Sequence, residues 1–519
     1  MLSTNESNES IVDLETCARE PIHIPGAIQP HGVLLVLKEP ELTIVQASEN
    51  TKLFFGEAAD QLIGEKLDRL LTKEQVDGIR AALVSGDPAE SNPLQLGFTG
   101  MHGSMALDGV LHQHDGFAIL EFEPAMSEGS ANFVNFYKAV SKTTGRLQSA
   151  LTLQTLLDEA ATGVRQMTGF DRVMIYRFAD GGEGEVIAES KAETVDPYFG
   201  LRYPASDIPE QARRLYTVSL IRCIPTVKYK PVPLVPSINI TTHRPTDLSH
   251  AGLRSVSPIH CEYLQNMGVA ASMSVSIVRN GKLWGLVACH HSAPKSVPYE
   301  TRKACSFIGQ IVSGEIGRRE AEEDTSYNSQ ATSIQAKFLE LIRSSGHPLA
   351  ELVNWAPNLL DLVPAAGAAI VTKDKAQMIG VTPTYTEVMS IVAALRAAQV
   401  PSTFSTRSLK NHFSDAGSMT KTASGVIVLE VSSECEEYIL YFRPEVAQTV
   451  TWGGDPNKAA VSTVDGFRLS PRKSFAAWRE QLQGTALPWT HNEIRAADEL
   501  RKLVSGISHG VPRSAKGPA

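Results

Sequence analysis

The segment Tyr203–Pro209 reads YPASDIP and continues as EQARRLY over residues 210–216. Pro204 and Pro209 fix their own φ angles and push the residues before them toward extended geometry. Proline also suits the first turn of a helix, so this stretch predicts an extended segment followed by a short helix that begins near Pro209. Asp207 then lies on a stiff turn beside a helix N-terminus, where a carboxylate serves as a helix cap or as an anchor for a ligand.

The bulk composition is that of a soluble globular protein. The chain has 519 residues, of which 42% are hydrophobic and 20% charged, and this length predicts about three domains. A net charge of −9 argues against a nucleic-acid surface, which would need a basic face. Residues 1–15 are too polar for a signal peptide, and no apolar run approaches membrane-spanning length. We therefore expect a cytoplasmic protein that binds neither nucleic acid nor membrane.

The cysteines are scattered and form no CxxC pair. This pattern favours free thiols in a reducing compartment over a disulfide framework or a zinc site. The six are Cys17, Cys223, Cys261, Cys289, Cys305 and Cys435.

Residues 1–130 predict a small αβ domain. The segment Glu20–Gly32 is rich in proline and glycine yet carries apolar side chains, and loops of this kind usually pack on something specific. The rest of the domain fits a sensor module of PAS type, although the pattern does not distinguish it from other small α+β domains. Strands are predicted at 32–37, 42–47 and 116–122, and a helix at 73–83.

Residues 131–322 predict a second αβ domain, compatible with a GAF fold. Apolar residues recur at helical spacing from 132 to 167. Two strands are joined by Asn280-Gly281, the dipeptide preferred in tight hairpin turns. From 299 to about 345 there is no proline, and one long helix is predicted that connects domains and also pairs with a partner chain. The strands are expected at 172–178, 185–189, 271–278 and 283–290.

Residues 323–508 alternate helices and strands again. The predicted fold class of the whole chain is therefore α+β, with three αβ domains built on central antiparallel sheets and linked by long helices. A long insertion punctuated by Gly and Pro lies between VTWGGDP at 450–456 and FRLSPRKSF at 467–475. Loops of this length in a compact domain are commonly lids or disordered. The tail 509–519 is predicted to be disordered.

The second domain carries side chains suited to a large, flat, acidic cofactor. Arginines can clamp carboxylates in bidentate fashion, hydroxyls donate hydrogen bonds, and tyrosines supply amphipathic aromatic surface. Taken singly, each has a simpler explanation as a surface ion pair, a solvent-facing serine, a structural histidine or a core tyrosine. Together with Asp207 they indicate a tetrapyrrole pocket. The set is Arg222, Arg254, Ser272, Ser274, His260, His290, Tyr176, Tyr203 and Tyr263.

The segment 203–214 resembles the central signature of phytochromes, the bilin-binding red-light receptors, in which the triplet that begins with Asp207 and Ile208 lies against the pyrrole rings. LSHAGLRSVSPIHCEYLQNMGV at 248–269 and GKLWGLVACHH at 281–291 resemble the bilin-lyase region of bacterial phytochromes. Trp452-Gly453-Gly454 and PRKSF at 471–475 are similar to the two tongue motifs of the PHY domain. The similarity covers residues 14–505.

The resemblance implies the photosensory core of a bacteriophytochrome. Its domains would be PAS over 1–130, with the N-terminal attachment segment, GAF over 131–322, and PHY over 323–508. The tongue would lie at about 445–478. Ile28 matches the residue that is threaded through a GAF loop, roughly 228–254, which implies a figure-of-eight knot between PAS and GAF.

The resemblance implies biliverdin, bound by a thioether to Cys17. In plant and most cyanobacterial phytochromes a cysteine directly precedes the pocket histidine, and Ile259 holds that position here. Cys261, directly after His260, is a competing candidate, although a free cysteine is usually a small buried apolar residue.

The family's photocycle would follow. The main chain at Asp207 and a water on His260 would hold the ring nitrogens, and His290 would bind the D-ring carbonyl until light isomerises the methine bridge between rings C and D. Asp207 would pair with Arg472 of the tongue, and exchange of partners would refold the tongue and shift the helices of a homodimer. The signal would pass to an output domain or partner protein. Further tongue positions in this relay are Trp452, Pro471 and Ser474.

One position departs from the family, since Ala476 stands where an acidic residue often follows the second tongue motif. No kinase motif or nucleotide-binding loop is found, so we expect no enzyme activity in these residues. One alternative is a GAF regulator for a cyclic nucleotide or heme, against which Cys17 and the two tongue motifs argue. Another is an enzyme acting on tetrapyrroles, for which no electron-donor site is found.

Overall fold

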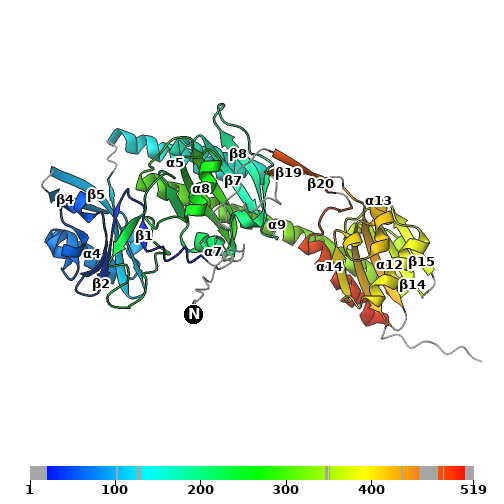
Figure 1. Ribbon diagram of the computed structural model, residues 1–519. Coiled ribbons are helices and arrows are strands. Elements are labelled where there is room, and N and C mark those ends of the chain that lie inside the picture. The colour runs from blue at the N-terminus through cyan, green and yellow to red at the C-terminus, as the bar shows by residue number, and fades with distance from the viewer. Residues whose placement is uncertain are drawn as a thin grey trace, which may run out of the picture. The chain divides into compact units, whose positions relative to one another are not determined.

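The computed structural model describes residues 20–100, 103–125, 130–179, 181–344, 349, 351–373, 375–433, 436–446, 448–454, 477–482 and 484–508. Cys17, Pro471, Arg472, Ser474 and the tail 509–519 lie outside these residues, so the predictions made for them stay predictions. The chain forms two compact units: Met1–Gly317 with Thr451–Trp478, and Arg318–Val450 with Arg479–Ala519. Figure 1 shows their helices and strands.

The first unit contains a seven-stranded antiparallel sheet. In hydrogen-bonded order its strands are β1 (Ala27–Ile28), β11 (Val232–Val235), β3 (Thr43–Ser48), β2 (Val33–Lys38), β6 (Phe117–Pro124), β5 (Gly103–His114) and β4 (Leu94–Gly100). Helix α4 (Lys73–Val84) begins at a capping box formed by Thr72 and Gln75, and it packs Val76 and Ile79 into the core of this sheet. Four short helices complete the domain: α2 (Thr51–Phe55), α3 (Ala59–Leu62), η1 (Leu67–Arg69) and η2 (Pro88–Ser91).

The first unit also contains strands of an eight-stranded sheet. Its order is β10 (Ile221–Ile224), β12 (Ala271–Arg279), β13 (Lys282–His291), β7 (Arg172–Phe178), β8 (Gly184–Lys191), β9 (Arg202–Tyr203), β19 (Gln448–Gly453) and β20 (Ala477–Leu482). The described strand pairs are antiparallel except β9 with β19, which pair in parallel through Arg202 and Trp452. Asn280 and Gly281 turn the chain between β12 and β13 at φ values of 48° and 73°, as the predicted hairpin requires.

The two faces of this sheet have different roles, because side chains alternate along a strand. One face is covered by α5 (Ser130–Ser149), α6 (Leu153–Thr168) and the first part of α9 (Tyr299–Ser344), around buried residues such as Val173 and Ile175. The other face carries Met174 and Tyr176, which belong to a separate aromatic cluster. This second face supports the site described below.

The second unit is built on a five-stranded antiparallel sheet. Its order is β15 (Lys375–Gly380), β14 (Gly367–Thr372), β18 (Glu437–Arg443), β17 (Gly425–Ser432) and β16 (Thr403–Thr406). The later part of α9 and helix α14 (His491–Ser508) share one apolar core with it, and α12 (Tyr385–Ala397) shares another. The short helices are α10 (Glu351–Asn354), α11 (Leu359–Leu362), η4 (Leu409–Asn411), η5 (Ser414–Met419) and α13 (Thr420–Ala423).

The segment around Ile28 is held from both sides by a loop of the second predicted domain, residues 228–254, called the lasso below. On one side, the Leu234 amide donates to the Gly26 carbonyl at 2.9 Å. On the other, the Gln29 amide donates to the Leu253 carbonyl at 2.7 Å. Ile28 itself is fully buried. These contacts are what a threaded segment requires, while the figure-of-eight knot stays a prediction.

The α+β class with antiparallel sheets is confirmed, and the long helix expected from 299 to about 345 is α9. The domain bounds at 130 and 322 stay predictions. Among the described residues, no helix combines the length and the apolar composition that crossing a membrane requires.

Candidate functional site

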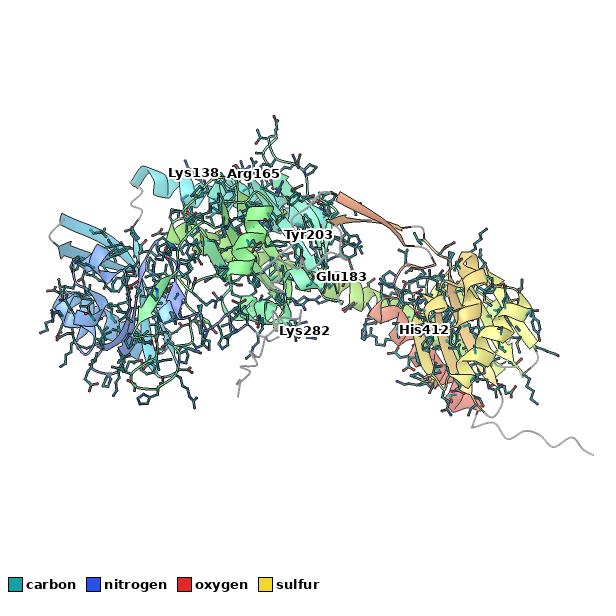
Figure 2. The ribbon with its side chains drawn as sticks, in the orientation of Figure 1. Lys138, Arg165, Glu183, Tyr203, Lys282 and His412 are labelled. Carbon is teal, nitrogen blue, oxygen red and sulfur yellow. The ribbon has the colours of Figure 1, made fainter. Side chains whose placement is uncertain are left out.

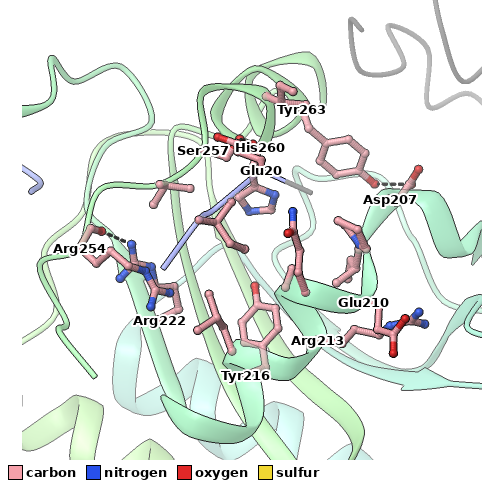
Figure 3. Close-up of a pocket in the computed structure, with 18 of the residues that line it drawn as sticks. Glu20, Asp207, Glu210, Arg213, Tyr216, Arg222, Arg254, Ser257, His260 and Tyr263 are labelled. Atoms are coloured by element: carbon pink, nitrogen blue, oxygen red, sulfur yellow. Dashed lines mark hydrogen bonds between the residues drawn. The ribbon is translucent and has the colours of Figure 1, made fainter. Parts of the chain in front are cut away.

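A cavity of about 470 Å³ lies in the first unit, and six of the predicted site residues line it. Figure 3 shows its walls, which come from the segment at Glu20, the turn before helix α7 (Glu210–Val218), strand β10, the end of the lasso and helix α8 (Pro258–Asn266). The six are Asp207, Ile208, Arg222, Arg254, His260 and Tyr263. Residues predicted from four separate segments of the sequence therefore line one cavity.

The turn at 203–209 forms as its prolines predict. Pro204 has a φ of −66° and precedes the 3-10 helix η3 (Ala205–Asp207), while Pro209 has a φ of −63° and precedes α7. No side chain caps α7, so Asp207 is not the helix cap that its position allowed. Its carboxylate instead accepts a hydrogen bond from the Tyr263 hydroxyl at 2.8 Å (Figure 3).

The two arginines are buried and are held by backbone carbonyls of the lasso. Arg222 donates to the carbonyls of Ala251, at 3.3 Å, and of Gly252, at 3.1 Å, and also to that of Arg254. Arg254 donates to the carbonyl of Ser249 at 3.0 Å. Burial lowers the pKa of both guanidinium groups. Neither forms an ion pair with a carboxylate among the described residues, so the cavity holds two positive charges suited to acidic groups.

Two histidines near the cavity are neutral at pH 7. Burial, with a smaller effect of Arg222, lowers the pKa of His260 to about 4. Burial, reinforced by Arg172, lowers the pKa of His290 to about 3. The Nδ1 atom of His290 is buried and has no hydrogen-bond partner among the described residues. His260 stacks on Tyr263 with a centroid distance of 6.2 Å and an interplanar angle of 10°. These imidazoles can donate or accept hydrogen bonds without adding charge.

An aromatic cluster lies on the pocket side of the sheet. The rings of Tyr176 and Tyr203 are 6.0 Å apart, and Phe178 contacts Tyr176 at 5.2 Å. Figure 2 marks Tyr203 among the side chains of this domain. Two glycines let the rings fit: a Cβ on Gly184 would lie 1.8 Å from Tyr176, and one on Gly453 would lie 2.6 Å from Tyr203. The first tongue motif therefore packs directly on Tyr203.

Ser272 and Ser274 lie on β12 opposite Ile224 and Arg222 of β10. They do not line the cavity, and neither do Tyr176, Tyr203 and His290. The roles of these five residues stay predictions.

Sequence reasoning missed several lining residues. Glu20 accepts a hydrogen bond from the Ser257 hydroxyl at 2.9 Å, and Arg213 and Tyr216 face the cavity from α7. The last two follow Pro209 at helical spacing, so the period of this helix could have identified them. Glu20 lies in an irregular segment, where no pattern indicates which side chains point inward.

Cys261, the competing candidate for attachment, is buried on α8 and does not line the cavity. Burial raises the pKa of its thiol, which lowers the share of the reactive thiolate. Among the described residues, no group of three His, Cys, Asp or Glu side chains could hold a metal ion. The arginines, the neutral histidines and the size of the cavity fit a tetrapyrrole with two acidic side chains.

Domain-family profiles match most of the chain. The PAS fold matches residues 17–125, the GAF domain 152–319 and the phytochrome region 331–510. Cyanobacterial phytochrome B of Nostoc sp. is 44% identical over 497 residues, covering 96% of this chain and 66% of the relative. A bacteriophytochrome of Xanthomonas campestris is 33% identical over 517 residues, covering 95% of this chain and 78% of the relative. The chain thus spans about two thirds of the length of the cyanobacterial relative.

Solved structures are similar over nearly the whole chain. The photosensory core module of a Stigmatella aurantiaca phytochrome has a TM-score of 0.84 at 40% identity, covering 97% of this chain and all of that one (100%). A bacteriophytochrome from R. palustris has a TM-score of 0.85 at 40% identity, covering 96% of this chain and 99% of that one.

Proposed function

The chain belongs to the phytochrome family, whose PAS-GAF-PHY photosensory core it comprises, and from this premise we propose that it is a red/far-red light receptor with a linear tetrapyrrole in the cavity of the first unit. The observation that carries the proposal is the pair of buried guanidinium groups, Arg222 and Arg254, which lack a carboxylate partner among the described residues. When bound, the tetrapyrrole supplies the light absorption and the isomerisation of its C/D methine bridge.

The chain's own residues bind and orient this group. Arg222 and Arg254 hold its two propionates, and Ser272 and Ser274 on the neighbouring strand add hydroxyl donors. The main-chain carbonyl of Asp207 and a water held by the neutral imidazole of His260 would accept from the ring nitrogens, beside Ile208. His290 donates to the terminal ring carbonyl, and Tyr176, Tyr203 and Tyr263 enclose that ring.

The tetrapyrrole is biliverdin, attached through a thioether to Cys17. Glu20 and Ile22 line the cavity and lie only a few residues after Cys17 in the sequence, which supports this assignment. The buried thiol of Cys261 is the poorer nucleophile, because burial raises its pKa.

The signal passes from the pocket to the tongue. β19 pairs with β9 through Trp452 and Arg202, so the start of the tongue lies beside Tyr203, which precedes Asp207 by four residues. The Asp207 carboxylate then pairs with Arg472, and exchange of its partners refolds the tongue, including Pro471 and Ser474. The photosensory core is not itself an enzyme. It acts as a cytoplasmic homodimer on an output domain or a partner protein.

The test is an absorption spectrum after addition of biliverdin, recorded before and after red and far-red illumination. We expect reversible red/far-red interconversion. In the Cys17→Ser variant we expect biliverdin to remain non-covalent, so that denaturing electrophoresis shows no attached chromophore. Cys261→Ser is the matched control and should keep the covalent bond.

Covalent attachment that survives Cys17→Ser and disappears in Cys261→Ser would move the anchor to Cys261. Absence of biliverdin uptake by the wild type would refute the photoreceptor function itself.

A further inference from the structure

A buried carboxylate of the first domain accepts hydrogen bonds from the lasso. Glu121 lies on β6 and is only 1% exposed. Its Oε1 atom accepts the Gly252 amide at 3.0 Å, and its Oε2 atom accepts the Leu253 amide at 2.5 Å. An anion buried this deeply is stable only when hydrogen bonds and positive charges compensate for its lost hydration.

The positive charges lie on the other side of the same peptide groups. Arg222 donates to the carbonyls of Ala251 and Gly252, while Glu121 accepts from the amides of Gly252 and Leu253. Arg254 follows directly in the chain. One carboxylate and two guanidinium groups therefore face each other through the lasso backbone. Arg302, whose charge also favours the ionised form of Glu121, is engaged by Glu123 at 2.8 Å.

Building on the proposed function, we propose that Glu121 is the counter-ion of Arg222 and Arg254 before the tetrapyrrole binds, and that it takes up a proton from solvent when the two propionates replace it in that role. The reason is charge balance. Two propionates neutralise two guanidinium groups, and a third buried anion then has no cation of its own, a costly state at low dielectric constant.

Glu121 is poised for this change. Burial raises its pKa to about 7, against the opposing effect of the two backbone hydrogen bonds, so a small change in the local field alters its charge at neutral pH. His112 on β5 lies 3.8 Å from Oε1 through its Nδ1 atom. Burial lowers the pKa of His112 to about 3, so it is neutral and can accept a hydrogen bond once a protonated carboxyl group moves within hydrogen-bond distance of it.

Apart from Arg302, which Glu123 engages, the remaining groups around Glu121 are histidines, carboxylates and a tyrosine. His112 is in ring contact with His250, an exposed residue of the lasso. His114 is engaged by Asp247 at 3.3 Å. The titratable and charged groups facing Glu121 are His112 and His114 from β5, Glu123 from β6, Arg222 from β10, Arg254, His250 and Asp247 from the lasso, and Tyr299 and Arg302 from α9.

The test counts protons taken up on binding, by titration calorimetry at pH 7.5 in two buffers with different ionisation enthalpies. The full chain is titrated with biliverdin and, separately, with biliverdin dimethyl ester, which lacks the propionate charges. Protonation of the ring nitrogens and thioether formation are common to both ligands. We expect the wild type to take up about half a proton more with biliverdin than with the ester.

In the Glu121→Gln variant, which is neutral at every pH, this excess should disappear. Glu74→Gln makes the same substitution at an exposed position on α4 of the same domain, away from the lasso amides, and it should keep the excess. Equal proton counts for the two ligands in the wild type would overturn the inference, even if Glu121→Gln failed to fold. An excess that persists in Glu121→Gln would overturn the assignment to Glu121. If neither ligand bound the wild type, the proposed function would fail instead.

Discussion

Arg222 and Arg254 are anchored by carbonyl groups, which fix their positions without forming an ion pair. A carbonyl carries only a partial charge, so each guanidinium charge still needs a carboxylate, whether Glu121 across the lasso backbone or a ligand. The groups that position each guanidinium are therefore different from the group that neutralises its charge. The sequence left each arginine open to a ligand contact or a surface ion pair, and the structure places both in the cavity wall.

Replacing Arg254 by Gln should weaken biliverdin binding about 10- to 100-fold, because a hydrogen bond to a charged group contributes about 1.5–3 kcal/mol. Equilibrium titration in a Cys17→Ser background, where binding is reversible, measures the effect. The same substitution at Arg214, an exposed residue of α7, is the control and should change affinity less than twofold. Equal losses at both positions would refute the role of Arg254.

Tyr441 and Tyr327 form a matched pair in the second unit. The Tyr441 ring is fully buried and its hydroxyl has no hydrogen-bond partner among the described residues. Tyr327 donates to the Leu362 carbonyl at 2.8 Å. In urea unfolding, Tyr441→Phe should leave the free energy of unfolding unchanged or raise it by up to about 1 kcal/mol, whereas Tyr327→Phe should lower it by about 1 kcal/mol. A clear loss in Tyr441→Phe would show that its hydroxyl is satisfied.

At the scale of helices and strands, local sequence patterns correctly predicted the elements whose formation depends on neighbouring residues. The hairpin at Asn280-Gly281, helix α4 and helix α9 follow from turn chemistry, capping and apolar spacing. The pairing of β1 with β11 was not predictable, since these strands have two and four residues and lie far apart in the sequence. Glu121 was missed for the same reason. Its role depends on the amides of Gly252 and Leu253, which lie 131 and 132 positions further along the chain.

The contact of Gly453 with Tyr203 predicts how firmly β19 is held. A Cβ added to Gly453 would displace the Tyr203 ring, so Gly453→Ala should destabilise this pairing by about 1–3 kcal/mol. Hydrogen exchange of the peptide at 448–453 should become faster. Gly314 on α9 has open space around it, so Gly314→Ala should leave that exchange unchanged. Unaltered exchange in Gly453→Ala would mean that the ring moves aside without cost.

Asp498 on α14 accepts a hydrogen bond from Thr403 on β16, and its titration makes the stability of the second unit depend on pH. Its carboxylate accepts from Thr403, Arg501 and Lys502, and these partners lower its pKa to about 2. Because the pKa of Asp498 is lower in the folded state, its ionised carboxylate stabilises the fold at pH values above the unfolded-state pKa of about 3.9. This stabilisation is lost as the pH falls through the folded-state pKa of about 2.

The Asp498→Asn variant should therefore be less stable than wild type by about 1 kcal/mol at pH 7, a modest value because the site is partly exposed. The difference should shrink as the pH falls from 4 toward 2, as thermal unfolding at several pH values would reveal. Asp77→Asn, which breaks an exposed pair with Arg80, should have no such pH dependence. A constant difference across this range would contradict the assignment.

At the scale of the whole molecule, the sequence predicted the fold class and, by resemblance, the order of the domains, because each domain carries its own apolar pattern and its own motif. Apart from the threading implied at Ile28, it did not predict how the first two domains share residues. Glu121 of the first domain accepts a hydrogen bond from a lasso amide of the second domain. Strand β11 of the second domain is part of the first domain's sheet. Such sharing depends on pairings across long sequence separations, which no local pattern encodes.

The borrowed strand β11 has a consequence for synthesis on the ribosome. β2, β3, β5 and β6 are complete once Pro124 has emerged, but the edge of β3 that pairs with Leu234 and Val235 stays open until those residues follow. An open strand edge is a template for pairing with other chains. A nascent chain is therefore most prone to aggregate while residues 125–231 are being made, and a fragment that stops before β11 should be recovered largely as insoluble protein, unlike one that ends after α9.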